Sequence, residues 1–197
     1  VIADEIYEYI NFEGKHESIG QFDFIKDQVV TVNGFSKGFA MTGWRVGYMG
    51  GPLWLAKACD KMQGQFTSGT NSIAQRACIT ALKGTMEPTK DMTKAYLRRR
   101  DLVLEKLNKI NGVKTYIPKG AFYIFPDISF FLGKSVGEYK IGNASDLAMY
   151  LLNVAHVSLV TGDAFGAPNC IRISFAASDE SLVIAMDRIK VALENLK

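Results

Sequence analysis

A lysine and an arginine lie eight positions apart just after an apolar run of the chain. The run from Val29 to Val32 predicts a strand, and Lys37 and Arg45 follow it. An amine at the carboxyl end of a strand can form a Schiff base with an aldehyde, and a guanidinium slightly further on can bind a phosphate. This pair therefore predicts a site for a ligand that carries both an aldehyde and a phosphate, as pyridoxal phosphate does.

The residues around this pair extend the pattern. From Ser36 to Tyr48 the chain reads S-K-G-F-A-M-T-G-W-R-V-G-Y. This string resembles the cofactor-lysine motif of the class I and II aminotransferases, which are pyridoxal-phosphate enzymes of fold type I. The resemblance implies that Lys37 is the catalytic Schiff-base lysine, and that Ser36 and Arg45 bind the cofactor phosphate. Many family members have a serine three residues before the lysine, where this chain has Gly34. Without the resemblance, Lys37 would be interpreted as a solvated loop residue and Arg45 as a surface ion-pair partner.

A second strand is predicted at the start of the chain, where Val1 and Ile2 lead into acidic and aromatic residues. In α/β proteins, ligands bind at the carboxyl ends of the buried parallel strands. In the family that the chain resembles, a D-x-x-Y element precedes the lysine, and Asp4 and Tyr7 match it. The resemblance implies that Asp4 faces the pyridine nitrogen and keeps it protonated. It also implies that Tyr7 hydrogen-bonds the phenolic oxygen and tunes the proton affinity of the imine. The alternatives are a helix cap or surface acid at Asp4 and a packing residue at Tyr7.

Near the other end of the chain an arginine lies inside an apolar strand pattern. The segment from Cys170 to Phe175 reads C-I-R-I-S-F, so Arg172 must either reach the solvent face or be held by a carboxylate. The resemblance implies that Arg172 binds the α-carboxylate of the substrate through two parallel hydrogen bonds. A plain exposed arginine on a strand is the alternative.

The composition indicates a soluble enzyme. The chain has 197 residues and a formal charge of +3, and no basic block indicates nucleic-acid binding. Three widely spaced cysteines predict reduced thiols and a cytoplasmic protein, and two distant histidines make a metal site improbable. No apolar run is long enough to span a bilayer, and no signal peptide is visible.

The pattern of apolar residues and turns predicts an α/β protein. Helices are expected over 53–66, 72–82, 86–110, 145–155 and 179–196, a buried strand over 44–51, short strands over 157–161 and 170–175, and a hairpin over 113–117 and 121–125. The resemblance divides these elements into two domains. Residues 1–85 would be the C-terminal part of the large cofactor-binding domain, a parallel-rich sheet with helices, and residues 86–197 a small α+β domain.

The expected activity is transamination between an amino acid, aspartate or similar, and a 2-oxo acid, with pyridoxal 5'-phosphate as cofactor. The chain starts inside a strand without an initiator methionine, so we expect a C-terminal fragment that is inactive alone and a homodimer in the full-length form. Two alternatives stay open. One is a pyridoxal-phosphate-dependent β-lyase or synthase, and the other is a ligand-sensing domain of a transcription regulator.

Overall fold

The computed structural model describes all 197 residues and divides into two compact units. The first unit is Val1–Thr93 and the second is Lys94–Lys197. The boundary lies inside helix α3 (Glu87–Leu107). A domain boundary after residue 85 therefore stays a prediction from the sequence.

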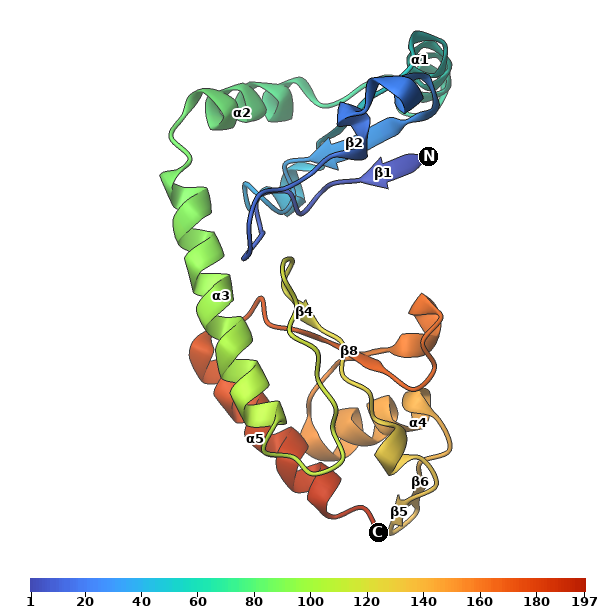
Figure 1. Cartoon of the computed structure of the whole chain (residues 1–197), viewed down its shortest axis with the longest axis vertical. Coiled ribbons are helices and arrows are strands. Elements are labelled where there is room, and N and C mark those ends of the chain that lie inside the picture. Colours follow the sequence, from blue (N-terminus) through green and yellow to red (C-terminus); the bar gives the residue numbers. More distant parts are fainter. The chain divides into compact units, whose positions relative to one another are not determined.

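The first unit contains a three-stranded sheet with the order β1-β2-β3. Its strands are β1 (Ile2–Asp4), β2 (Val30–Gly34) and β3 (Gly47–Gly50). The central strand β2 runs parallel to β1 and antiparallel to β3 (Figure 1). It begins in the predicted apolar run, where Val29 and Val30 are buried.

The prediction of a buried strand over residues 44–51 is wrong in its start and in its burial. Residues Thr42–Trp44 form a single 3₁₀ turn, and Arg45 has a left-handed backbone with φ 55°. This conformation interrupts an extended chain, so the strand begins only at Gly47. The side chain of Tyr48 on this strand is 51% exposed.

Two helices follow the sheet, and both carry exposed apolar side chains. Helix α1 (Leu53–Phe66) follows Pro52, and helix α2 (Ser72–Lys83) is capped by the Asn71 side chain, which accepts from the N–H of Ala74. Large apolar side chains on these helices that are at least 41% exposed are Leu53, Trp54, Met62, Phe66, Ile73, Ile79 and Leu82.

None of the helices combines the length and the apolar composition that a membrane span requires.

The second unit is an α+β arrangement around an antiparallel sheet with the order β4-β8-β7. Its elements are β4 (Tyr123–Ile124), β5 (Ser135–Val136), β6 (Tyr139–Lys140), α4 (Ala144–Tyr150), β7 (Val160–Thr161), β8 (Ile171–Ser174) and α5 (Asp179–Glu194). A π-helical turn, Leu151–Ala155, continues α4. Side chains from the sheet and from both helices form the core, among them Ile124, Leu147, Leu151, Phe175 and Met186. Figure 1 shows β4 and β8 running side by side.

The predicted hairpin over residues 113–117 and 121–125 is wrong. Strand β4 pairs with β8, through Tyr123 and Ser174, and not with the segment that precedes it. Lys114 instead makes an isolated bridge with Asp127. The left-handed backbone of Ala121, with φ 58°, falls between the turn and β4, so the two segments do not form a ladder.

Candidate active site

Lys37 lies in the turn that follows the carboxyl end of β2. The turn folds back on itself, since the N–H of Met41 donates to the carbonyl of Phe35 over 3.1 Å and the N–H of Ala40 to that of Lys37 over 3.2 Å. The Lys37 side chain is half-buried. A short loop at the end of a central strand is a common position for a functional side chain, because the strand fixes both the direction and the start of the loop.

Asp4 lies at the corresponding end of the neighbouring strand. It is the last residue of β1, in register with Val32 of β2, and the N–H of Glu5 donates to the Val32 carbonyl over 2.9 Å. Because β1 and β2 are parallel, Asp4 and the loop of Lys37 leave the sheet at the same edge. The Asp4 carboxylate is exposed, and its Oδ1 accepts the N–H of Ile6 over 3.2 Å.

Tyr7 follows Asp4 in the turn that leaves β1. Its side chain is half-buried, and its carbonyl accepts the N–H of Ile10 over 2.9 Å. The Ile10 side chain is fully buried, so this turn is anchored in the core of the first unit. The structure thus brings Asp4, Tyr7 and Lys37 to one edge of one sheet.

Arg45 and Ser36 are connected through the threonine between them. The guanidinium Nη1 of Arg45 donates to the carbonyl of Thr42, and the hydroxyl of Thr42 donates to the carbonyl of Ser36, each over 2.9 Å. Arg45 is exposed, and its left-handed backbone is unusual for a residue with a side chain. These contacts hold the arginine close to the start of the lysine loop.

The structure gives a reason for Gly34 at the position where many relatives have serine. A Cβ atom there would lie 3.0 Å from the carbonyl oxygen of Val46 and 3.1 Å from the Cα of Gly47. Both are backbone atoms of the adjacent chain, so a side chain would require the backbone to move. The chain therefore offers no side-chain donor at position 34.

The segment after Asp4 has a polar network of its own. Glu5 accepts a hydrogen bond from the Ser18 hydroxyl over 2.6 Å, and its other oxygen lies 3.0 Å from Nε2 of His16. Burial raises the pKa of the Glu5 carboxyl, but Ser18 and His16 outweigh it and leave this pKa below its ordinary value. Ligand atoms of Glu5, Glu8 and His16 lie within 4.8 Å of one another. The hydrogen bonds from Ser18 and His16 to Glu5 fix the loop next to Asp4.

Arg172 lies in the second unit, in the middle strand of its sheet. Its neighbours Ile171 and Ile173 are buried, and Arg172 points to the other face of β8. The guanidinium carbon lies 4.4 Å from the ring centroid of Tyr123 and 4.4 Å from that of Phe165. Stacking on two rings orients the guanidinium and leaves the N–H donors in its plane for an anion.

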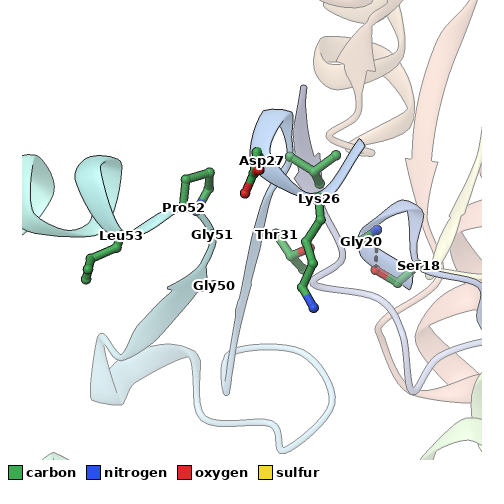
Figure 2. A pocket seen from close by; sticks show the side chains of 10 residues that line it. Ser18, Gly20, Lys26, Asp27, Thr31, Gly50, Gly51, Pro52 and Leu53 are labelled. Atoms are coloured by element: carbon green, nitrogen blue, oxygen red, sulfur yellow. Dashed lines mark hydrogen bonds between the residues drawn. The ribbon is translucent and has the colours of Figure 1, made fainter. Parts of the chain in front are cut away.

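One hollow in the first unit does not contain any of these residues. It measures about 470 Å³ and is lined by Ser18, Gly20, Lys26, Asp27, Val29, Thr31 and Gly50 to Leu53. Figure 2 shows Pro52 and Leu53 on one side of it and Ser18 and Gly20 on the other. The strand residues Val29 and Thr31 are at the amino end of β2, whereas Lys37 follows the carboxyl end. Lys26 in this hollow therefore serves as a control lysine for Lys37, because it lies at the opposite end of the same strand.

The donor set at the carboxyl edge fits pyridoxal phosphate. The amine of Lys37 matches an aldehyde, the Arg45 guanidinium and Ser36 hydroxyl match a phosphate, and the carboxylate of Asp4 matches a protonated ring nitrogen. The exposure of Asp4 and Arg45 leaves both charged groups accessible to a ligand.

Sequence reasoning missed three contacting groups. Thr42 was part of the motif, but its spacing gave no sign that it connects Arg45 to Ser36. Tyr123 lies within the predicted hairpin and Phe165 between two predicted strands, and neither position indicated a contact with Arg172. The contact between Tyr123 and Arg172 joins residues far apart in the chain, which leaves no local pattern in the sequence.

The whole chain is similar to known aminotransferases. The bifunctional aspartate aminotransferase and glutamate/aspartate-prephenate aminotransferase of Petunia hybrida is 47% identical over 204 residues, which cover 100% of this chain and 42% of that protein. The crystal structure of the aspartate aminotransferase from Rhizobium meliloti matches with a TM-score of 0.95 at 42% identity, over 100% of this chain and 50% of that one. The aromatic aminotransferase from Pyrococcus horikoshii OT3 matches with a TM-score of 0.89 at 37% identity, over 98% and 50%.

These matches confirm the predicted fold class and the resemblance to the aminotransferases. The chain spans about half the length of the relatives that it matches. The family model described as aminotransferase class I and II matches residues 1–189. This chain therefore belongs to the class I and II aminotransferase family.

Proposed function

We propose that the full-length protein transfers the amino group of an amino acid, aspartate or similar, to a 2-oxo acid, with pyridoxal 5'-phosphate as cofactor. The observation that carries the proposal is the placement of Asp4 and Lys37 at one edge of the parallel pair β1 and β2. The names of the relatives from Petunia hybrida and Rhizobium meliloti support aspartate as the amino donor. The activity is proposed for the intact protein, because this chain spans about half of those relatives.

Each residue of this edge has a defined task in the proposal. When bound, pyridoxal phosphate supplies an aldehyde carbon and a protonated ring that withdraws electrons from the substrate. The amine of Lys37 would hold the cofactor through that carbon, and its Nζ would act as the base for the proton of the substrate α-carbon. Asp4 holds the proton on the ring nitrogen, and Tyr7 donates a hydrogen bond to the phenolic oxygen. Arg45, together with Ser36, binds the phosphate.

Arg172 has the proposed role of binding the substrate α-carboxylate. Its guanidinium is already oriented by the rings of Tyr123 and Phe165, and a planar carboxylate can accept two parallel hydrogen bonds from it. Every amino acid and 2-oxo acid carries this group, so Arg172 would serve both half-reactions.

The proposal includes a homodimer of the full-length protein in the cytoplasm. The exposed apolar side chains of α1 and α2, such as Trp54 and Phe66, support burial against other protein surface. The three cysteines, Cys59, Cys78 and Cys170, are all free, which supports a reducing compartment.

The direct test maps the amine that binds the cofactor. The full-length protein is loaded with pyridoxal 5'-phosphate, reduced with borohydride and digested, and the modified peptide is identified by mass spectrometry. We expect the modification at Lys37. The Lys37→Ala variant should lose the modification and about 10²- to 10⁴-fold of the transamination rate, whereas Lys26→Ala, in the hollow lined by Ser18 and Pro52, should lose neither. Modification at Lys26 instead would refute the proposed site.

A second measurement separates transamination from the other reactions of such cofactors. The loaded protein is mixed with aspartate alone, without a 2-oxo acid. Transamination predicts one equivalent of pyridoxamine phosphate and one of the 2-oxo acid product per site. Release of a side-chain fragment with ammonia would indicate a β-lyase, and binding without either product would indicate a sensing domain.

A further inference from the structure

The loop that carries Lys37 is attached to the first turn of α3 through a buried threonine. Thr89 is only 7% exposed, and its hydroxyl donates to the carbonyl of Gly38 over 2.9 Å. Gly38 is itself buried and directly follows Lys37. A buried carbonyl needs a partner, and here the partner comes from an element 51 positions further along the chain.

The same face of α3 also holds the segment of Tyr7. One helical turn beyond Thr89, the hydroxyl of Thr93 lies 2.9 Å from the carbonyl of Tyr9 and 3.0 Å from that of Thr89. A hydroxyl has one proton and donates it to one of these two acceptors at a time. Residues four apart lie on one side of a helix, so one helix face contacts both segments that carry proposed cofactor contacts.

The two segments also touch each other closely. A Cβ atom on Gly38 would lie 2.5 Å from Cδ2 of the Tyr9 ring and 3.2 Å from its Cβ and Cγ. The ring of Tyr9 in turn packs edge-on against Phe39, with ring centroids 5.5 Å apart. Gly38 is therefore confined by two contacts. The Tyr9 side chain lies against its Cα, and the Thr89 hydroxyl binds its carbonyl.

From this confinement we propose that Thr89 is a positioning residue for Lys37. By fixing the carbonyl of Gly38, Thr89 holds the backbone of the adjacent lysine, so that its Nζ is presented at the edge where Asp4 ends β1. The inference rests on the proposed function, because it assigns Thr89 a task only if Lys37 is the amine that binds the cofactor. It predicts that the Thr89 hydroxyl contributes to cofactor binding through Lys37 alone.

A double-mutant cycle on the full-length protein tests this prediction. The dissociation constant for pyridoxal 5'-phosphate is measured by equilibrium titration in the parent and in Thr89→Val, then again in both with Lys37→Ala. Valine keeps the shape of the side chain and removes the donor. We expect Thr89→Val to weaken binding about tenfold when Lys37 is present, the size of one buried hydrogen bond, and less than about twofold when it is absent. Thr89→Ser, which keeps the hydroxyl, should bind like the parent.

The cycle separates positioning from general stability. Equal weakening in both backgrounds, or no weakening with Lys37 present, would overturn the inference. If the valine variant fails to fold, Thr89→Ala provides a second variant without the hydroxyl, and its comparison with Thr89→Ser tests the same point. Borohydride mapping of the parent distinguishes failure of this inference from failure of the proposed function. If the modification is at Lys37 and the dissociation constant is unchanged in Thr89→Val, only the role of Thr89 is refuted. Modification elsewhere refutes the proposed function as well.

Discussion

Replacing Gly38 by alanine should destabilise the first unit, because the new methyl group has no room. Its Cβ would lie 2.5 Å from Cδ2 of Tyr9 and 3.2 Å from the Cβ and Cγ of the same residue. A turn of the ring about its own axis cannot relieve the contacts at Cβ and Cγ, so the side chain or the loop must shift. Overpacking of this kind costs about 1–3 kcal/mol. The loss of glycine freedom in the unfolded chain offsets about 0.4–1 kcal/mol, which leaves a net loss of about 1.3 kcal/mol when the middle of each range is used.

The control variant comes from the same loop. A Cβ atom added to Gly43 would have no other atom within 4 Å, and the φ of Gly43 lies outside the left-handed range. Gly43→Ala should therefore be neutral or gain about 0.4–1 kcal/mol. The two variants differ only in the space around the added methyl group.

Tryptophan fluorescence during urea unfolding measures the effect in the correct part of the chain. The two tryptophans, Trp44 and Trp54, both lie in the first unit, so their fluorescence reports its unfolding and not that of the second unit. Equal midpoints for Gly38→Ala and Gly43→Ala would refute the reasoning. In a Tyr9→Ala background the contacts with Cγ and Cδ2 are removed and only the 3.2 Å contact with Cβ is left, so Gly38→Ala should cost much less there than in the parent.

Three further outcomes are expected. Arg172→Lys should raise the KM for the amino acid at least tenfold, because a lysine cannot give a carboxylate two parallel hydrogen bonds; steady-state kinetics of the full-length protein measure it, and an unchanged KM would remove Arg172 from the substrate site. Hydrogen bonds from Arg98 and its neighbour Arg99 hold the pKa of Asp179 at about 2, below its ordinary 3.8. The lowered pKa of Asp179 stabilises the folded protein at pH values above the carboxyl pKa of the unfolded chain, and this stabilisation is lost as the pH falls through the folded-state pKa. In Asp179→Asn this group no longer titrates, so the stability of the second unit should fall less steeply between pH 4 and 2 than in the parent. Tyr150→Phe should cost about 0.5–1.5 kcal/mol, because the buried hydroxyl donates to the carbonyl of Ala192 over 2.9 Å; a chemical-denaturation midpoint equal to the parent would show that this bond contributes nothing.

The helices were the part of the fold that the sequence predicted well. Helix α1 has the predicted bounds, and α5 begins after Ser178, whose side chain accepts from the N–H of Ser181 as expected of a cap. These features depend on residues a few positions apart, which a sequence displays directly. The resemblance also named residues at the carboxyl edge of the sheet, because its motif specifies their types and spacing, and their roles stay predictions.

Several of the features that sequence reasoning missed depend on distant partners. Strand β4 pairs with a segment fifty residues later, and the turn chemistry around Pro118 gave no sign of that choice. Similarly, Thr89 lies inside a helix, where a threonine can be exposed or buried. No residue near it in the sequence identifies the Gly38 carbonyl as its acceptor. Propensity and periodicity are local, whereas these contacts are set by packing.

The stacking of Arg172 on Tyr123 and Phe165 restricts the shape of the acid that it can bind in its proposed role. A stacked guanidinium offers hydrogen only around its rim, within a single plane. A flat carboxylate that meets this rim with both oxygens stays within the plane, whereas a tetrahedral phosphonate or sulfonate that meets it with two oxygens has a third oxygen out of the plane, on the side of a ring. The two rings would thereby make this half of the protein discriminate between acids of equal charge by their geometry.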